Sequence, residues 1–197
     1  MRRLLLALPF ALLPLAVAHA DDTTVKHGSL GTHEHGTARV NAALDDQTLA
    51  LEMQTPAMNI VGFEHLATTD ADKAAVAKAR ALLEQPLALF NLPAAAGCSV
   101  ASQHLQSPLF GDVMPAEDDD DDHDHDHDQP AATGEHHHSE IHASYEFTCT
   151  SPDKLKALDL SQVFKTFPAT HKVVVQMIAP EGQKGLDATP DNSTLKF

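Results

Sequence analysis

Basic residues are scarce in this chain of 197 residues. It contains 13 Lys and Arg against 28 Asp and Glu, and its formal net charge at pH 7 is −15. The phosphate groups of DNA and RNA repel so acidic a protein, so we expect no nucleic-acid partner. After residue 20 the sequence also lacks any apolar run of membrane-spanning length, so we expect no membrane insertion.

The first twenty residues are predicted to be a signal peptide. Arg2 and Arg3 precede an apolar stretch that ends at Val17, and a small-x-small triplet ends at Ala20. A transmembrane anchor is the alternative, but two prolines interrupt the stretch, which is too short to cross about 30 Å of hydrocarbon. We therefore expect cleavage after Ala20 and a bacterial periplasmic location, with a flexible lead-in over residues 21–36.

Only two cysteines are present, Cys98 and Cys149. They are too far apart for the paired-ligand spacing of a Cys₂His₂ zinc site. In the oxidising periplasm we expect a disulfide between them, which closes a loop of about fifty residues and stabilises the fold by roughly 4 kcal/mol on the chain-entropy model. Two free buried thiols are the alternative.

Common catalytic motifs are also missing. The sequence has no His-Glu-x-x-His, Gly-x-Ser-x-Gly, phosphate-loop or dinucleotide fingerprint. His33 and His35 form a His-x-His pair like that on a barrel strand of metal-dependent hydrolases, but the chain is too short for a (β/α)₈ barrel. We therefore expect that the protein is not an enzyme. A zinc-dependent hydrolase with an open coordination position is only a third hypothesis.

Alternation of apolar and polar residues predicts a β-rich domain. Strands are expected at 37–44, 48–55, 98–106, 140–149, 171–180 and 192–197, with a turn at 45–47 and a turn-rich stretch at 181–192. An Ala-rich helix is expected from Asp70, its N-cap, to about Asn91, kinked or ended at Pro86, and a second helix at 151–160. The predicted fold class is therefore α+β, one domain over 37–197 with an antiparallel sheet and two helices.

The two cysteines set an expected strand register. A disulfide would place Cys98 opposite Cys149 in an antiparallel pair of strands, which puts Gln106 opposite Ile141 at the other end. Alternate residues from Ile141 to Cys149 would then face the core. Under this pairing, residues from about 112 to 139 form a long insertion at the far end of a hairpin whose near end is held by the disulfide.

The insertion has a composition unlike that of the rest of the chain. Residues 117–128 read EDDDDDHDHDHD, in which nine of the twelve residues are acidic and three are histidine. Such a segment cannot bury apolar surface, so it is predicted to be disordered. A solvated loop is the alternative for a charge run, but interleaved histidine is typical of metal-binding tracts.

The histidines of this region are spaced to share a metal ion. Alternate residues of an extended chain lie roughly 7 Å apart at Cα, so imidazoles at i and i+2 can turn toward one cation. Imidazole with carboxylate and no thiolate suits Zn²⁺, and also Ni²⁺, Cu²⁺ or Co²⁺. Protonation of the imidazoles should weaken this binding in acid. The predicted metal ligands are His123, His125, His127, His136, His137, His138 and His142, with Asp124 and Asp126 as oxygen ligands.

A second histidine set lies outside the insertion. His33 and His35 flank Glu34, and His65 lies in the apolar connection that begins at Pro56, which is predicted to be irregular. These three histidines are also predicted as metal ligands. The alternatives are a solvated turn for the first two and, for His65, a polar side chain that satisfies a loop.

Several sequence blocks occur in an order that resembles a known family. The blocks are HEHGTARVNAAL, TPAMNIVGFEH, LPAAAGC, a His/Asp-rich insertion, a strand that ends in Cys, and APEGQKGLDATPDNSTLKF. This order is similar to that of the ZrgA-type zinc uptake proteins, a family of proteobacterial periplasmic proteins. The resemblance implies zinc-regulated expression and an accessory role in zinc acquisition beside an ABC-type importer. It maps the family's variable histidine-rich insertion to residues 123–138.

Two functions of different classes follow from these observations. In the first, a periplasmic protein captures Zn²⁺ with residues 117–142 and passes it to a periplasmic zinc-binding receptor or an ABC zinc transporter. In the second, an envelope protein-interaction domain uses its sheet face, and the acidic insertion only keeps the protein soluble. Deletion of residues 117–138 separates the two hypotheses, because only the first expects zinc-dependent function to be lost.

Overall fold

The computed structural model describes residues 34–112 and 139–197. The predicted signal peptide, most of the predicted lead-in and most of the predicted insertion lie outside these residues, so all three stay predictions. The described residues belong to a unit of the chain that starts at His33.

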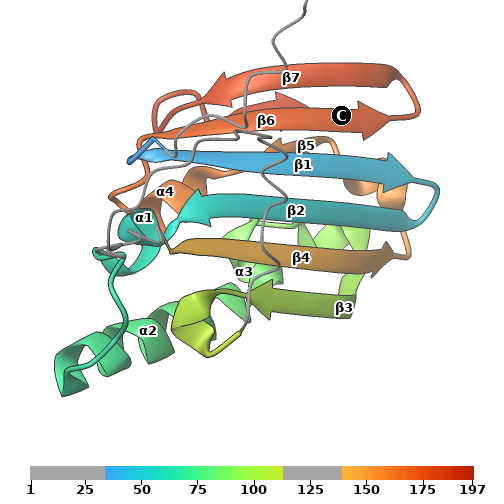
Figure 1. Ribbon diagram of the computed structural model, residues 1–197. Helices are drawn as coiled ribbons and strands as arrows, with labels where there is room; N and C mark the ends of the chain where they lie inside the picture. The colour runs from blue at the N-terminus through green and yellow to red at the C-terminus, as the bar shows by residue number, and fades with distance from the viewer. Residues whose placement is uncertain (1–33, 113–138) are drawn as a thin grey trace, which may run out of the picture. The chain divides into compact units, whose positions relative to one another are not determined.

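The described residues contain eight strands. These are β1 (Thr37–Asp45), β2 (Thr48–Pro56), β3 (Cys98–Gln106), β4 (Glu140–Cys149), β5 (Ala157–Asp159), β6 (Lys172–Ala179), β7 (Gly182–Ala188) and β8 (Thr194–Lys196). Six of them form one sheet in the order β3-β4-β2-β1-β6-β7 (Figure 1). Neighbours in this sheet are antiparallel except β1 and β6, which run parallel. β5 and β8 form a separate antiparallel pair.

The helical elements in the described residues are short. They are α1 (Ala57–Val61), α2 (Asp70–Leu83), α3 (Pro86–Leu89) and α4 (Ser161–Thr166), with 3₁₀ turns η1 (Ala94–Ala96), η2 (Pro108–Phe110) and η3 (Pro152–Lys154). None of these helices is long and apolar enough to cross a membrane. The predicted long helix divides at Pro86, which begins α3. Its N-cap is Thr69 rather than Asp70, because Thr69 and Asp72 exchange hydrogen bonds in a capping box.

The hydrophobic core lies between the sheet and the helices. Alternate residues of β1, β2, β4 and β6 are buried, and side chains of the helices cover them. The chain's single tyrosine, Tyr145, packs edge-on against Phe90, and its hydroxyl donates to the Leu83 carbonyl at 2.9 Å. Burial raises the pKa of Tyr145. The alternation predicted for β4, with residues 141–149 facing inward at every second position, is therefore confirmed.

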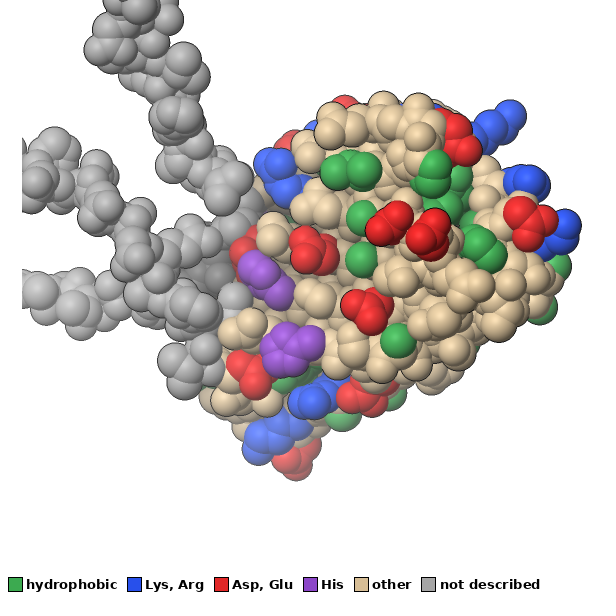
Figure 2. All heavy atoms as spheres, turned by 90° about the vertical axis from the view of Figure 1, so that its right-hand side faces the viewer, with side chains coloured by type: hydrophobic (Ala, Val, Ile, Leu, Met, Phe, Trp, Pro, Cys, Tyr) green, Lys and Arg blue, Asp and Glu red, His purple; other side chains and the backbone are tan. Residues whose placement is uncertain are grey.

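The other face of the sheet carries polar side chains. Asn41, Glu52 and Gln176 are exposed on it, on three adjacent strands. Figure 2 shows a different surface, the end of the sheet at the right of Figure 1, where acidic and basic side chains both appear and hydrophobic side chains form only small patches.

The predicted fold class is confirmed in part, since the described chain is mostly β-sheet with short helices. The purely antiparallel sheet is wrong, because η3, β5 and α4 return the chain to the end of the sheet where β1 begins, and β6 therefore pairs parallel with β1. The turn-rich stretch at 181–192 instead contains β7. The Gly and Asp residues of β7 are typical of turns, so the sequence did not indicate this strand, which lies at the sheet edge and is mostly exposed.

The predicted helix at 151–160 is also wrong. This segment contains η3 and β5, and α4 follows it. Leu158 is fully buried and pairs with Leu195 of β8. Strand pairing with a distant segment therefore outweighs the local leucine spacing, which favoured a helix.

The register of β3 against β4 departs from the prediction at one end. Gln106 lies opposite His142 rather than Ile141. The cause is a β-bulge between Val100 and Ser102, where an extra residue in β3 shifts the pairing by one position.

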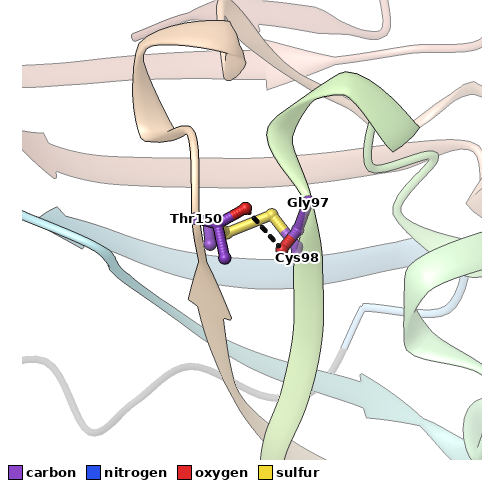
Figure 3. The surroundings of a disulfide bond; sticks show 4 residues. Gly97, Cys98 and Thr150 are labelled. Atoms are coloured by element: carbon purple, nitrogen blue, oxygen red, sulfur yellow. Dashed lines mark hydrogen bonds between the residues drawn. A yellow bond between two sulfur atoms is a disulfide. The ribbon is translucent and has the colours of Figure 1, made fainter.

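The predicted disulfide is confirmed. Cys98 and Cys149 are bonded and lie directly opposite each other in β3 and β4. Gly97, the residue before β3, has a φ of +59°, and the Thr150 hydroxyl lies where a Cβ on residue 97 would be placed (Figure 3). That hydroxyl donates to the Gly97 carbonyl at 3.5 Å. The positive φ and the nearby Thr150 hydroxyl both favour glycine at this position next to the disulfide.

We expect Gly97→Ala to lower the free energy of unfolding by about 3 kcal/mol. Alanine would adopt a positive φ, which costs roughly 1–2 kcal/mol, and its Cβ would collide with the Thr150 hydroxyl. Urea denaturation without reducing agent measures the change. Gly111→Ala is the matched control, because Gly111 also has a positive φ, +88°, but its Cβ position has no atom within 4 Å. Equal losses in the two variants would show that the Thr150 contact imposes no constraint.

Candidate metal-binding site

One end of the sheet carries two of the predicted ligands. β1, β4 and β6 begin at this end and β2 finishes there, since Pro56 pairs with Glu140 and β1 runs parallel to β6. His35 lies two residues before β1, and His142 is the third residue of β4. We call this the histidine end of the sheet, which lies at the left of Figure 1.

A buried asparagine fastens the start of β1 to helix α1. The block PAMNIVGFEH folds as α1 and the turn after it, and Asn59 of this helix is 2% exposed. Its Oδ1 accepts from the Gly36 N–H at 2.7 Å, and its Nδ2 donates to the Thr37 carbonyl and the Thr55 hydroxyl, both at 3.0 Å. These bonds satisfy buried polar groups of three segments at once, so they fix the path of the chain around His35.

The backbone on both sides of His35 is held from the other direction as well. The Gly36 carbonyl accepts from the N–H groups of His171 and Lys172, at 2.7 and 2.9 Å, and the Glu34 carbonyl accepts from Thr37 at 3.0 Å. Gly36 has a φ of +84°, and a Cβ there would lie 3.1 Å from Nδ1 of His171. The glycine after His35 therefore allows both the turn and the close approach of β6.

The side chain of His35 is paired with a carboxylate. Its Nε2 lies 2.9 Å from Oε1 of Glu64, which follows α1. The Glu64 side chain is only 14% exposed, whereas that of His35 is 52% exposed. The Glu64 carboxylate is thus largely buried, while much of the His35 imidazole faces solvent.

The same arrangement occurs a second time at the histidine end. Nε2 of His142 lies 3.0 Å from Oε2 of Glu140, and the side chains are 31% and 16% exposed. Glu140 and His142 are two residues apart on one strand, so their side chains share a face of the sheet.

The two flanks of the predicted insertion lie at the histidine end. Where the described chain resumes, the Ser139 hydroxyl donates to the Glu64 carbonyl at 2.8 Å, and the Ser139 carbonyl accepts from the Ala57 N–H at 2.8 Å. Where the described chain stops, the Asp112 carboxylate accepts from the N–H of Ser107, which follows β3 directly. The described chain therefore stops and resumes at the histidine end of the sheet.

His65 lies apart from these pairs in its contacts. It is exposed, its ring stacks on Phe63 with centroids 4.7 Å apart, and its Nδ1 lies 3.0 Å from the Leu66 carbonyl. No group of three His, Cys, Asp or Glu side chains in residues 34–112 and 139–197 is placed to hold a metal ion. The predicted ligands outside the described residues are His33, His123, Asp124, His125, Asp126, His127, His136, His137 and His138, so the metal-site assignment stays a prediction.

The hydrogen bonds determine which ring nitrogens remain available. A carboxylate only accepts hydrogen bonds, so His35 and His142 must each donate from Nε2, and the neutral ring then carries its lone pair on Nδ1. Histidines that bind metals commonly donate their other N–H to a carboxylate or a backbone carbonyl. Glu64, Glu140 and Asn59 were not among the predicted site residues. Only the Glu140-x-His142 spacing could have suggested one of these pairs.

Two hollows of the described surface lie elsewhere. One of about 850 Å³ borders the β1–β2 turn and Phe197, and another of about 630 Å³ lies over β2, β1, β6 and β7. None of the described residues that line them is a histidine. The paired candidate ligands His35 and His142 therefore lie at the histidine end and do not line either hollow.

Comparison with known protein families gives one match. The model of a family described as ZrgA family zinc uptake protein matches residues 32–197. This span includes every residue that the structure describes, and so both histidine–glutamate pairs and the Asn59 segment. No curated protein matches the chain.

We expect Asn59→Ala to lower the free energy of unfolding by about 3 kcal/mol. The substitution leaves the Gly36 N–H and the Thr37 carbonyl without their asparagine partner in a buried place, and each unsatisfied group costs about 1–3 kcal/mol. Urea denaturation measures the loss. Asn41→Ala, at an exposed position of β1, is the control and should change the value by about 0.5 kcal/mol or less. A loss for Asn59→Ala no larger than that of the control would contradict the role given to Asn59.

Proposed function

Because the chain belongs to the ZrgA family of zinc uptake proteins, we propose that it captures Zn²⁺ in the bacterial periplasm and assists its import. The family name indicates a role in zinc uptake. The finer proposal concerns the ligands, which are the His and Asp side chains of residues 117–142, and the recipient, which is a periplasmic zinc-binding receptor or an ABC-type zinc importer.

The position of the insertion's flanks is the observation that carries this proposal. Asp112 and Ser139 both lie at the histidine end, where His35 and His142 are also found. Zinc captured by the insertion would therefore be attached to the domain beside further imidazoles. This placement supports one zinc-handling region rather than separate ones.

The donor chemistry supports reversible capture. Both cysteines of the chain are in the disulfide, so imidazole and carboxylate are the donors left for zinc. Such ligands also accept Ni²⁺, Cu²⁺ or Co²⁺, and the family membership favours Zn²⁺ among them. We also propose that the protein is not an enzyme. Zinc uptake requires that the ion be captured and released, whereas a catalytic zinc site keeps one coordination position open for a substrate.

Two features, one from the sequence and one from the structure, support a periplasmic location. The predicted signal peptide would direct export, and a disulfide such as that between β3 and β4 persists in an oxidising environment such as the bacterial periplasm. Both features support a periplasmic protein.

We expect that deletion of residues 117–138 removes most zinc binding by the full chain. Isothermal titration calorimetry at pH 7.4 measures the number of bound ions and their affinity. The matched control keeps the length and the acidic residues but replaces the six histidines of the insertion with Asn, and it should lose zinc as the deletion does. At pH 5.5 an imidazole with the usual pKa of about 6.5 is mostly protonated, so binding to the unaltered chain should weaken.

Two results would contradict the proposal. Unchanged zinc binding after the deletion would place the zinc ligands on the folded domain and make the insertion an accessory. Zinc binding that survives in the Asn variant but not in the deletion would show that the carboxylates of the insertion, and not its histidines, bind the ion.

A further inference from the structure

We propose that the free edge of β3 pairs with β3 of a second copy of this chain, so that two sheets join into one. The six-stranded sheet has two edge strands, β7 and β3, and β3 lies at its lower edge in Figure 1. The backbone N–H and C=O groups on the free side of an edge strand can pair with another strand. This inference concerns assembly and does not depend on zinc binding.

The first observation is how little of β3 is covered. No residue of β3 is buried and residues 99–104 are all exposed, whereas alternate residues of β4 beside it are buried. No backbone hydrogen bond joins β3 to a described segment other than β4. Alternate residues of β3 therefore direct their backbone donors and acceptors away from the described sheet.

The second observation is that β3 lacks the side chains that usually protect a sheet edge. Charged residues and proline hinder the pairing of edge strands, and the sequence of β3, CSVASQHLQ, contains no Asp, Glu, Lys, Arg or Pro. The opposite edge strand, β7, carries Lys184 and Asp187, and β8 contacts it. The bulge after Val100 protects part of β3, but Ser102–Gln106 stay in regular pairing with β4.

The third observation is apolar surface beside this edge. Val100 of β3 and Leu87 of α3 are each 37% exposed, and α3 contacts β3. Val100 lies opposite the buried Phe147 of β4, so it faces the helical side of the sheet. A strand added at this edge would remove part of this apolar area from water.

A second copy is the occupant that these observations favour. Two copies with a formal net charge of −15 each repel, and the repulsion is least for contact through an uncharged strand. A two-fold axis perpendicular to the sheet makes the two copies of β3 antiparallel and keeps both sets of helices on one face. No like charges of β3 are then opposed, and the apolar side chains of both copies share that face.

Antiparallel pairing also determines where the two histidine ends lie. β3 runs toward the histidine end, because its last residue, Gln106, lies opposite His142. The joined sheet would therefore carry one histidine end at each of its two ends, and its formation needs no metal ion.

The size of the contact predicts a weak dimer. The five residues in regular pairing span about 17 Å. They provide less contact than a stable interface, which buries about 1,600 Å² in total. We therefore expect a transient dimer that forms only at high concentration.

Sedimentation velocity of the full chain in EDTA tests the dimer, because the chelator removes metal ions that could bridge two copies. We expect a monomer at about 1 μM and mostly dimer at about 1 mM. Hydrogen–deuterium exchange at the same two concentrations locates the contact. Exchange of β3 amides should slow about tenfold at the higher concentration, while that of β7 amides should not change.

His104→Lys places a charge at the centre of Ser102–Gln106, where the two copies face each other. Like charges directly opposite each other destabilise strand pairing, so the dissociation constant of the dimer should rise about fivefold. Gln183→Lys is the matched control, because it adds the same charge at an exposed position of the other edge strand. It should leave the dissociation constant unchanged. Urea denaturation of both variants verifies that they fold.

Three outcomes would overturn the inference. They are a chain that stays monomeric at about 1 mM, a dimer whose slowed amides lie outside β3, and equal weakening of the dimer by the two lysine variants. Either lysine lowers the net negative charge, so weakening by His104→Lys alone cannot arise from net charge. Zinc binding without a dimer would refute this inference alone, and a dimer without zinc binding would refute the proposed function alone.

Discussion

The hydrogen bonds of the buried Asn59 side chain are the constraint on which the histidine end depends. They join helix α1, the end of β2 and the start of β1 through one side chain that is 2% exposed. Since Glu64 follows α1 and His35 precedes β1, the same bonds decide that these two residues meet. Gly36 extends the arrangement to β6, because His171, just before β6, and Lys172, its first residue, donate to the Gly36 carbonyl beside the one parallel pair of the sheet. A polar network of this kind specifies one arrangement because a slip of any segment would leave buried groups unsatisfied.

Much of the sheet could be predicted from residue alternation, and the exceptions have identifiable causes. β1, β2, β4 and β6 each present one face to the core, which produces a clear period of two. β7 lies at the edge and is exposed along most of its length, so its composition reads as a turn. The parallel pairing of β1 with β6 depends on the path of the chain through β5 and α4. Alternation of apolar and polar residues predicts strands but not the path of the chain between them. The bulge between Val100 and Ser102 likewise has no signature in the residues around it.

The candidate site could also be predicted only in part. Histidine is a visible signal, and the sequence indicated both His35 and His142. The carboxylate that contacts Nε2 of each ring was not predicted, and for His35 that carboxylate is 29 residues away in the chain. Contacts of this range are properties of the fold. Glu140, two residues from its histidine on one strand, is the case in which strand geometry could have suggested the pair, although Glu140 was not among the predicted site residues.

The disulfide has a consequence for how this protein can change. Cys98 and Cys149 are 51 residues apart, and the histidine-rich insertion lies wholly between them. A peptide bond cut anywhere in that interval leaves a single covalent molecule, with β3 still joined to β4. Lengthening the interval is also inexpensive, since doubling a flexible loop costs only about 0.6 kcal/mol. The bond therefore separates the evolution of the insertion from that of the sheet, so that residues can be gained, lost or repeated in one without unfolding the other.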